Sequence, residues 1–351
     1  MTERLQALAR EIARELAAGD RVGGASGASG SGAAGVATRG APPEDHATAP
    51  SPISPNHSTS HRTISVPSAA ELTARAAAAT GAGALDAPPG VTFVRQNARM
   101  ADFIDHTLLK AEATAREIDK LCDEAKEHRF AAVCVNPVWV RRCAERLRGV
   151  PVQIATVIGF PLGANTPEIK RHEATLAVEH GATELDMVVA LGHIKSGDWQ
   201  HVADDIAAVV DGAQGRLVKV IIESAALSPV EIIKACAIAK EMRAQYVKTS
   251  TGFHAAGGAS AEAVALMRLV VGDAMGVKAS GGVRDCEAAL KMIANGATRI
   301  GTSSGVSMAK CLGQGPLPLN DLLSLASQHS TGCATCATGS HAGGKGGAGP
   351  Y

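Results

Sequence analysis

Residues 246–250 read Tyr-Val-Lys-Thr-Ser and residues 276–280 read Gly-Val-Lys-Ala-Ser, and these two short runs decide the fold. Both have the composition of a short β-strand, and a helical pattern over 260–271 lies between them. A strand, a helix and a second strand at this spacing form a βαβ unit, in which the two strands are parallel. The same alternation extends in both directions along the chain.

Between about residues 101 and 326 the chain contains eight such β-type runs, separated by helical patterns. The β-type runs are 104–109, 132–135, 152–158, 184–189, 217–223, 246–250, 276–280 and 299–302, and the helical patterns are 114–128, 167–180, 197–210, 229–242, 260–271 and 285–294. Eight βα units in roughly 225 residues fit the (β/α)8 TIM barrel, typically about 250 residues long. A doubly wound sheet is the alternative, but the GxGxxG that would open a dinucleotide-binding fold is absent after the first run. The predicted fold is an α/β TIM barrel.

The segments on either side of the barrel differ in composition. In residues 21–68, 30 of 48 residues are Gly, Ser, Pro or Ala and five are Val, Ile, Leu or Met, too few to offset the entropy of ordering. We expect residues 1–95 to be a mostly disordered, low-complexity extension with short helices at 1–19 and 69–79. Residues 96–326 would form the barrel domain, and residues 327–351 a flexible Gly-rich tail. A chain that starts near residue 95 is expected to keep its activity.

Charge and cysteine content exclude several classes of protein. The chain has 34 basic and 34 acidic residues, so it has no net field to attract nucleic acid or an anionic membrane. No run approaches the ~18 apolar residues of a membrane span, and the first residues lack the apolar core of a signal peptide. Six of the eight cysteines stand singly in apolar segments, and the Cys333/Cys336 pair has no second pair at zinc spacing. We expect a cytoplasmic protein with no metal site, and its oligomeric state stays open, with a homo-oligomer compatible.

Charged residues recur inside the predicted barrel strands. Because side chains alternate along a strand, Lys248 shares a face with Ser250, and Lys278 shares a face with Ser280, while Asp186 and Lys219 lie on inward faces of neighbouring strands. A buried, unpaired ammonium is costly, so these lysines either form an ion network with acids or take part in chemistry.

Three of these residues fit Schiff-base catalysis. A desolvated lysine beside another cation has a depressed pKa, and its neutral amine can attack a carbonyl carbon. The resulting iminium accepts electrons when a carbon–carbon bond breaks, and a carboxylate moves the protons. Lys248, Lys278 and Asp186 supply the amine, the neighbouring cation and the carboxylate.

Two loops carry the pattern of a phosphate site. Gly281 and Gly282 follow one strand, and Ser303 and Ser304 follow the next. In TIM barrels the loops after the last two strands commonly bind phosphate through backbone N–H groups. Glycine permits close approach of the backbone, and the serines supply hydroxyl groups.

Five motifs together resemble the deoxyribose-phosphate aldolase family. They are DHTLLK at 105–110, VIGFPLG at 157–163, ELDMVV at 184–189, VKTSTGF at 247–253 and VKASGGVR at 277–284, and the resemblance covers about residues 101–326. It implies a TIM barrel that cleaves 2-deoxy-D-ribose 5-phosphate reversibly into D-glyceraldehyde 3-phosphate and acetaldehyde, with no metal or organic cofactor. The implied partners are thus small molecules, a sugar phosphate and aldehydes.

The resemblance also implies roles for individual residues. Lys248 is the Schiff-base lysine, Lys278 tunes it and Asp186 relays protons. The implied lining and substrate-binding residues are Lys219, Cys134, Thr107, Thr251 and Gly252, with Gly281, Gly282, Ser303 and Ser304 at the phosphate. Residues 190–193, Ala-Leu-Gly-His, depart from the Asn-Ile-Gly-Ala frequent in the family, which puts local loop contacts in doubt. Tyr351 ends the chain as a tyrosine does in some relatives, where it folds over the site.

Other readings remain open at this point. His106 is expected to be a core histidine bonded to a neighbour, and Glu223 to be an ion-pair partner of the lysines rather than a positioning group. The rival functions are another phosphate-binding barrel enzyme, either a different Schiff-base aldolase or a sugar-phosphate isomerase, and a non-catalytic scaffold.

Overall fold

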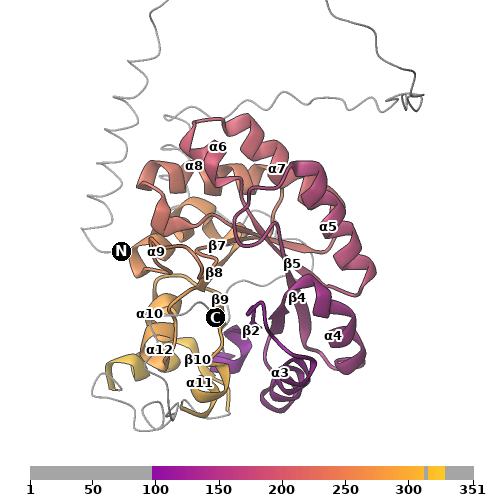
Figure 1. Ribbon diagram of the computed structural model, residues 1–351. Coiled ribbons are helices and arrows are strands. Elements are labelled where there is room, and N and C mark those ends of the chain that lie inside the picture. The colour runs from indigo at the N-terminus through magenta and orange to yellow at the C-terminus, as the bar shows by residue number, and fades with distance from the viewer. Residues whose placement is uncertain (1–96, 312–314, 329–351) are drawn as a thin grey trace, which may run out of the picture.

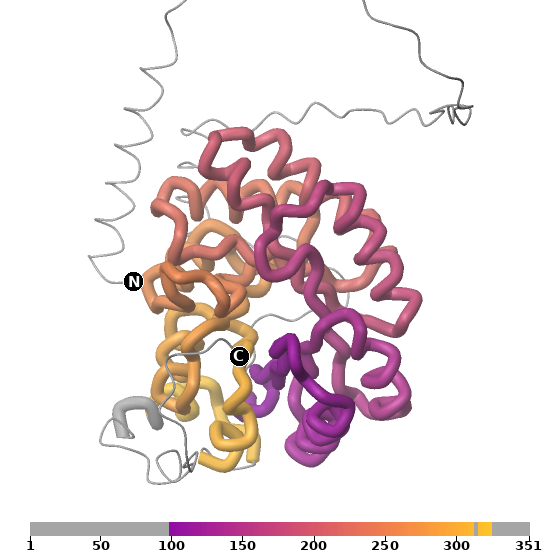
Figure 2. The backbone as a smooth tube through the Cα atoms, viewed as in Figure 1, coloured from indigo at the N-terminus to yellow at the C-terminus, as the bar shows by residue number. Residues whose placement is uncertain are grey.

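Eight parallel strands close into a barrel in the computed structural model, which describes residues 97–311 and 315–328 (Figure 1). The barrel strands are β2 Ile104–Leu108, β3 Ala132–Val135, β4 Gln153–Ile158, β5 Glu184–Val188, β6 Leu217–Ile221, β7 Tyr246–Lys248, β8 Gly276–Ser280 and β9 Arg299–Thr302. Each barrel strand pairs with its neighbour in sequence, and β9 pairs with β2 to complete the ring. The colours of Figure 2, from indigo to yellow, run around the barrel in the same order. The closed ring confirms the TIM barrel and excludes the doubly wound sheet.

Helices surround the barrel on its outer face (Figure 1). Six lie where the sequence predicts them, with ends within two residues: α3 Ala115–His128, α5 Pro167–Glu179, α7 Trp199–Gly212, α8 Pro229–Glu241, α9 Ala261–Val271 and α10 Cys286–Ala294. The sequence patterns missed four shorter ones in the described residues: α4 Val140–Arg146, α6 Leu191–Lys195, α11 Gly305–Cys311 and α12 Leu319–Gln328. Short 3-10 turns are η1 Met100–Phe103, η2 Pro137–Trp139, η3 Ser224–Ala226 and η4 Gly272–Ala274.

Helix starts follow from local sequence. Thr114 caps α3 and forms a capping box with Glu117, and Ser228 does the same with Glu231 at α8. Asp285 accepts the Ala288 N–H at the start of α10. These caps satisfy backbone N–H groups that have no partner within the helix. They fix where each helix leaves the loop that follows a strand, and therefore the length of each loop at the carboxyl end of the barrel.

A short antiparallel ribbon lies outside the ring. β1 Asn97–Ala98 pairs with β10 Leu317–Pro318, and η1 then leads from β1 into the amino end of β2. The predicted boundary between barrel and tail, at residue 326, falls inside α12. The predicted extension over 1–95, the Cys333/Cys336 pair and Tyr351 lie outside the described residues. No helix in the described ranges is long and apolar enough to cross a bilayer.

Two strands end two residues earlier than their sequence patterns indicate. The run 217–223 stops as β6 at Ile221, and the run 246–250 stops as β7 at Lys248. Glu223 has a φ of 56°, in the left-handed region, which a strand cannot contain. The segment after β6 therefore turns out of the ladder at Glu223, at the carboxyl end of the barrel, whereas after β7 the Thr249 N–H still donates to the Lys278 carbonyl oxygen.

Candidate active site

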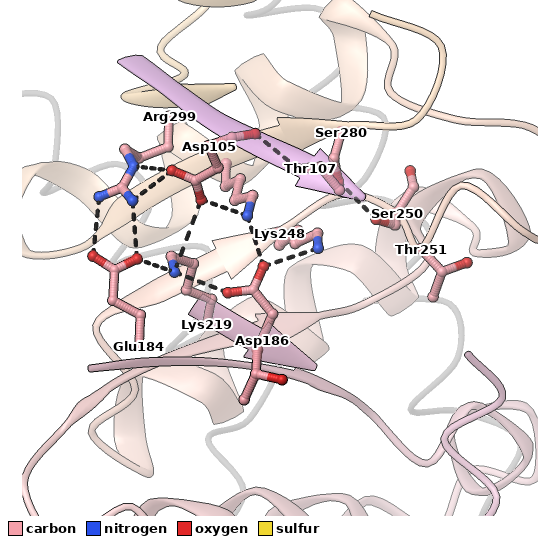
Figure 3. Close-up of polar contacts among 12 residues, drawn as sticks. Asp105, Thr107, Glu184, Asp186, Lys219, Lys248, Ser250, Thr251, Ser280 and Arg299 are labelled. Atoms are coloured by element: carbon pink, nitrogen blue, oxygen red, sulfur yellow. Dashed lines mark hydrogen bonds and ion pairs between the residues drawn. The ribbon is translucent and has the colours of Figure 1, made fainter. Parts of the chain in front are cut away.

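Three lysines converge on one carboxylate inside the barrel (Figure 3). The Lys248 and Lys278 Nζ atoms lie 2.9 and 2.7 Å from Oδ2 of Asp186, and Lys219 Nζ lies 2.8 Å from Oδ1. Asp186 and Lys219 are partners in the β5–β6 register, and Lys248 and Lys278 in the β7–β8 register. All four side chains are buried, Lys248 with 2% exposure and the other three with none. The predicted catalytic trio is therefore assembled in one place.

The surrounding charges shift the pKa values of the two lysines that share Oδ2 of Asp186 in opposite directions. Burial lowers the pKa of Lys248, and the neighbouring Lys278 lowers it further against the opposing effect of Asp186. Burial also disfavours the charged form of Lys278, but Asp105 and Asp186 outweigh it and raise its pKa well above the ordinary value. One amine is thus biased toward the neutral form, while its neighbour stays an ammonium.

Asp186 stays ionised despite its burial. Desolvation alone would raise the pKa of this carboxyl, but Lys219, Lys248 and Lys278 together hold it well below its usual range. A carboxylate with two free lone-pair directions on each oxygen can accept all three lysine contacts. It can therefore exchange protons with the amine of Lys248 without leaving its position.

A second layer of charge lies beneath these residues, toward the amino ends of the strands (Figure 3). Arg299 donates to Asp105 and, at 3.2 and 2.9 Å, to Glu184. Asp105 also pairs with Lys278, and Glu184 pairs with Lys219. Burial would raise the pKa of Asp105, but Arg299, Lys278 and Lys219 lower it to about 2. We call the seven residues Arg299, Asp105, Glu184, Lys278, Lys219, Asp186 and Lys248 the charged column.

Sequence reasoning missed Arg299 and Glu184 as members of this arrangement. The signal was present, because Glu184 is in phase with Asp186 on β5, and period-two alternation puts both side chains on the inner face. Arg299 likewise begins β9 and is 7% exposed. Active sites of barrels lie at the carboxyl ends of the strands, whereas Glu184 and Arg299 are the first residues of their strands, so the usual position of a site does not indicate them.

Glu223 corrects one sequence-based expectation. Among the described residues it makes no ion pair with a lysine, and its carboxylate instead accepts the Thr251 hydroxyl at 2.6 Å and the Thr251 N–H at 3.2 Å. The left-handed backbone at Glu223 turns this side chain away from the lysine face that strict alternation would give it. Glu223 thus positions the loop that follows β7, and the Thr251 hydroxyl is engaged within the protein.

Glycines bring the loops after β7 and β8 into contact. Gly252 and Gly281 have φ values of 85° and 81°, and a Cβ atom on Gly281 would lie 3.3 Å from Cα of Gly252. A Cβ atom on Gly258 would lie 2.1 Å from the Gly281 carbonyl oxygen, so no larger residue fits there. The backbones of the two loops therefore lie in van der Waals contact, and the Ala259 N–H donates to the carbonyl oxygens of Ser280 and Gly281.

The remaining predicted phosphate residues lie at the same end of the barrel. Gly282, with a φ of 81°, is exposed after β8. Ser303 is exposed and Ser304 half-buried between β9 and α11. β8 and β9 are neighbours in the ring, so these two loops share one side of the carboxyl-terminal rim.

The other predicted lining residues are buried inside the barrel. Cys134 is fully buried on β3, and burial raises the pKa of its thiol. Thr107 on β2 pairs with Cys134 in the strand register and donates its hydroxyl to the Asp105 carbonyl oxygen at 2.8 Å. His106 is a buried core residue whose Nε2 lies 2.8 Å from Glu124, as expected for a histidine satisfied by a neighbour. Lys219 forms ion pairs with Asp186 and Glu184, so it holds these two carboxylates in position.

One group of side chains has the composition of a metal site. His193, Asp198 and His201 present ligand atoms that lie within 4.8 Å of one another, at the junction of α6 and α7. Asp198 caps α7 through the His201 N–H, and its other oxygen lies 3.0 Å from Nδ1 of His193. The three side chains are on the outer helical layer and take no part in the charged column.

Comparison with known proteins gives consistent matches. A profile of the DeoC/LacD family aldolases matches residues 99–310. Proteins named deoxyribose-phosphate aldolase from Geobacillus sp. (strain WCH70) and Thermotoga maritima are 58% and 53% identical to the chain over 212 and 220 residues. Those matches cover 60% and 62% of this chain, and 95% and 88% of the relatives.

Solved structures agree. A putative deoxyribose-phosphate aldolase from Coccidioides immitis has a TM-score of 0.60 at 38% identity, with 69% of this chain and 96% of that chain covered. A tetrameric deoxyribose phosphate aldolase from Aeropyrum pernix has a TM-score of 0.57 at 34% identity, with 60% and 89% covered. Since the family profile spans more than half of the sequence and the barrel holds the lysine and carboxylate that such chemistry needs, this chain belongs to the DeoC/LacD family of aldolases.

Proposed function

We propose that this aldolase cleaves 2-deoxy-D-ribose 5-phosphate reversibly into D-glyceraldehyde 3-phosphate and acetaldehyde through a Schiff base on Lys248. The observation that carries the proposal is the pairing of Lys248 and Lys278 on the same oxygen of Asp186. Burial and the second ammonium favour a neutral amine at Lys248, which is the form that attacks a carbonyl. The names of the similar proteins supply the substrate.

The first half of the reaction forms the imine. Lys248 Nζ attacks the aldehyde carbon of the open-chain sugar and gives a carbinolamine. Asp186 takes a proton from the nitrogen of the first adduct and passes it to the alkoxide oxygen, directly or through a water. A second proton, taken up from solvent, converts that hydroxyl into the departing water, so the protonated imine remains. Lys278 stays charged throughout and holds the Asp186 carboxylate close to the reacting nitrogen.

The second half breaks the carbon–carbon bond. Loss of the proton from the C3 hydroxyl expels D-glyceraldehyde 3-phosphate, and the electron pair of the C2–C3 bond moves toward the iminium nitrogen to give an enamine. Protonation of the enamine carbon and hydrolysis of the imine release acetaldehyde and restore Lys248. The scheme uses no metal or organic cofactor.

The substrate phosphate is assigned to the rim after β8 and β9. There, the backbone N–H groups near Gly281 and Gly282 and the hydroxyls of Ser303 and Ser304 provide neutral donors suited to phosphate. Gly252 allows the loop after β7 to approach from the other side. Thr107 and Cys134 line the cavity near the reacting carbon, while Thr251 and Lys219 position other groups.

Two further properties belong to the proposal. The six described cysteines are free thiols, which fits a reducing cytoplasm. A homo-oligomer is proposed from the tetrameric Aeropyrum pernix relative and from the exposed Val138 and Leu162, which are 77% and 75% accessible. Light scattering coupled to gel filtration tests the assembly.

Reductive trapping tests the chemistry. The full chain is incubated with 2-deoxy-D-ribose 5-phosphate and sodium borohydride, and the modified peptide is identified by mass spectrometry. We expect one adduct, on Lys248. An adduct on a different lysine would contradict the assignment, and turnover without any adduct would favour a barrel isomerase, which needs no imine.

A further inference from the structure

A cavity opens at the end of the barrel opposite the candidate active site. Its volume is about 450 Å³, within the range of small-molecule sites. Its walls come from residues that precede strands: Arg99 and Asp102 before β2, residues 129–131 before β3, residues 150–153 leading into β4, and Arg299 at the start of β9. The cavity therefore lies at the amino-terminal end of the barrel, where no reaction step is assigned.

The lining is strongly basic. Arg99, Lys126, Arg129 and Arg299 contribute four positive charges, against one carboxylate, that of Asp102. Asp102 pairs with Arg99 at 2.6 Å, and Lys126 has only a long contact of 3.4 Å to Asp123 outside the cavity. Arg129 is exposed at the end of α3, and no ion pair joins it to another residue of the described ranges. Two of the four cations, Arg99 and Arg299, are therefore paired with carboxylates, whereas Arg129 is unpaired among the described residues and Lys126 is weakly paired, so the free positive charge lies at the mouth.

Arg299 gives the cavity a buried anchor. Its side chain is 8% exposed, with Nε and Nη2 in contact with Asp105 and Nη1 and Nη2 in contact with Glu184. A guanidinium carries five N–H donors, so one N–H, on Nη1, has no contact with these carboxylates. Figure 3 shows it at the end of the charged column that lies away from Lys248. A planar guanidinium held rigidly by two carboxylates offers this remaining N–H to an oxyanion in a fixed direction, and the bidentate faces of the group are occupied by Asp105 and Glu184.

We propose that this cavity is a second binding site, for a small phosphate-bearing anion, separate from the site at the carboxyl-terminal end. Arg129 and Lys126 attract and hold the anion at the mouth, and Arg299 and Arg99 contact it inside. A phosphate suits a mouth with two cations, Arg129 and Lys126, that the cavity wall does not neutralise. Arg299 belongs to both the cavity and the charged column, whereas the mouth residues Arg129 and Lys126 make no ion pair with the lysines of the column, so substitution at the mouth tests this site separately from the proposed reaction.

Titration of the full chain with inorganic pyrophosphate by isothermal calorimetry at low salt tests the proposal. The key variant is the double substitution Arg129→Gln and Lys126→Gln, which removes two charges from the mouth. We expect pyrophosphate to bind at least tenfold more weakly to it than to the wild-type chain, equivalent to about 1.4 kcal/mol. Circular dichroism melting confirms that the variant is folded.

Two matched controls localise the effect. Arg116→Gln removes an exposed arginine at the other end of α3 and should change the pyrophosphate affinity by less than twofold. Ser303→Ala combined with Ser304→Ala alters the carboxyl-terminal rim. This variant should still bind pyrophosphate at the site that contains Arg129. Equal affinity of the double variant and the wild type, an equal loss in Arg116→Gln, or loss of all binding in the serine variant would each overturn the proposal.

Discussion

Removal of the Lys278 ammonium, which shares Oδ2 of Asp186 with Lys248, should slow the reaction, and most strongly at neutral pH. Lys248 and Lys278 lie 2.9 and 2.7 Å from the same oxygen, so their nitrogens are at most about 5.6 Å apart. Two unit charges at that separation repel by about 3 kcal/mol at an effective dielectric constant of ~20. In Lys278→Met this repulsion is lost, and the neutral fraction of Lys248 at pH 7 should fall roughly 100-fold.

The sign of the pH dependence follows from the same geometry. Lys278 lowers the pKa of Lys248, so its removal raises that pKa, and the neutral amine then forms only at higher pH. The acid limb of the kcat/KM profile for deoxyribose 5-phosphate should move to higher pH in Lys278→Met, and the deficit in rate should shrink as pH rises. Profiles from pH 5 to 10 measure both effects.

Two further variants keep this test decisive. Lys219→Met also removes an ammonium from Asp186, but from Oδ1, farther from Lys248, so its acid limb should move less. Lys278→Met combined with Asp105→Asn avoids leaving a buried carboxylate without its lysine, and it should show the same displacement if the single variant fails to fold. A folded variant with a rate deficit that is constant across this pH range would refute the reasoning.

Two other substitutions probe the rest of the site, and a third probes a buried ion pair between the helices, that of Lys170 on α5 with Asp205 on α7. Lys248→Leu should abolish turnover and borohydride trapping while the chain remains folded, since leucine suits an apolar interior; circular dichroism and a trapping assay check both points. Glu223→Gln should raise KM about tenfold with a smaller change in kcat, because it weakens a charge-assisted bond that holds the loop after β7; an unchanged KM would argue against a positioning role. Lys170→Met should lower the urea midpoint by an amount equivalent to about 3–5 kcal/mol, because it leaves Asp205, which lies 2.7 Å from Lys170 Nζ, buried without its partner; adding Asp205→Leu should recover much of the loss.

The barrel, and the gathering of Lys248, Lys278 and Asp186 inside it, could be predicted from the sequence because both depend on short-range periodicity. Strands and helices of regular length alternate through 101–326, and one-in-two alternation within 246–250 and 276–280 puts Lys248 and Lys278 on the inner face. Once the barrel is accepted, the strand order brings those lysines to adjacent strands. Asp186 follows by the same rule from β5.

Contacts between distant residues were decided only by the tertiary structure. Glu223 was expected to pair with lysines, but a left-handed backbone turn, invisible to a period-two pattern, directs it to Thr251. Arg299 meets Asp105, 194 positions away, only because ring closure makes β9 a neighbour of β2. The basic cavity likewise draws its walls from four separate segments. Local spacing along a strand specifies which face a side chain occupies. Closure of the barrel specifies which charges share the interior, and the pKa of Lys248 depends on those neighbouring charges.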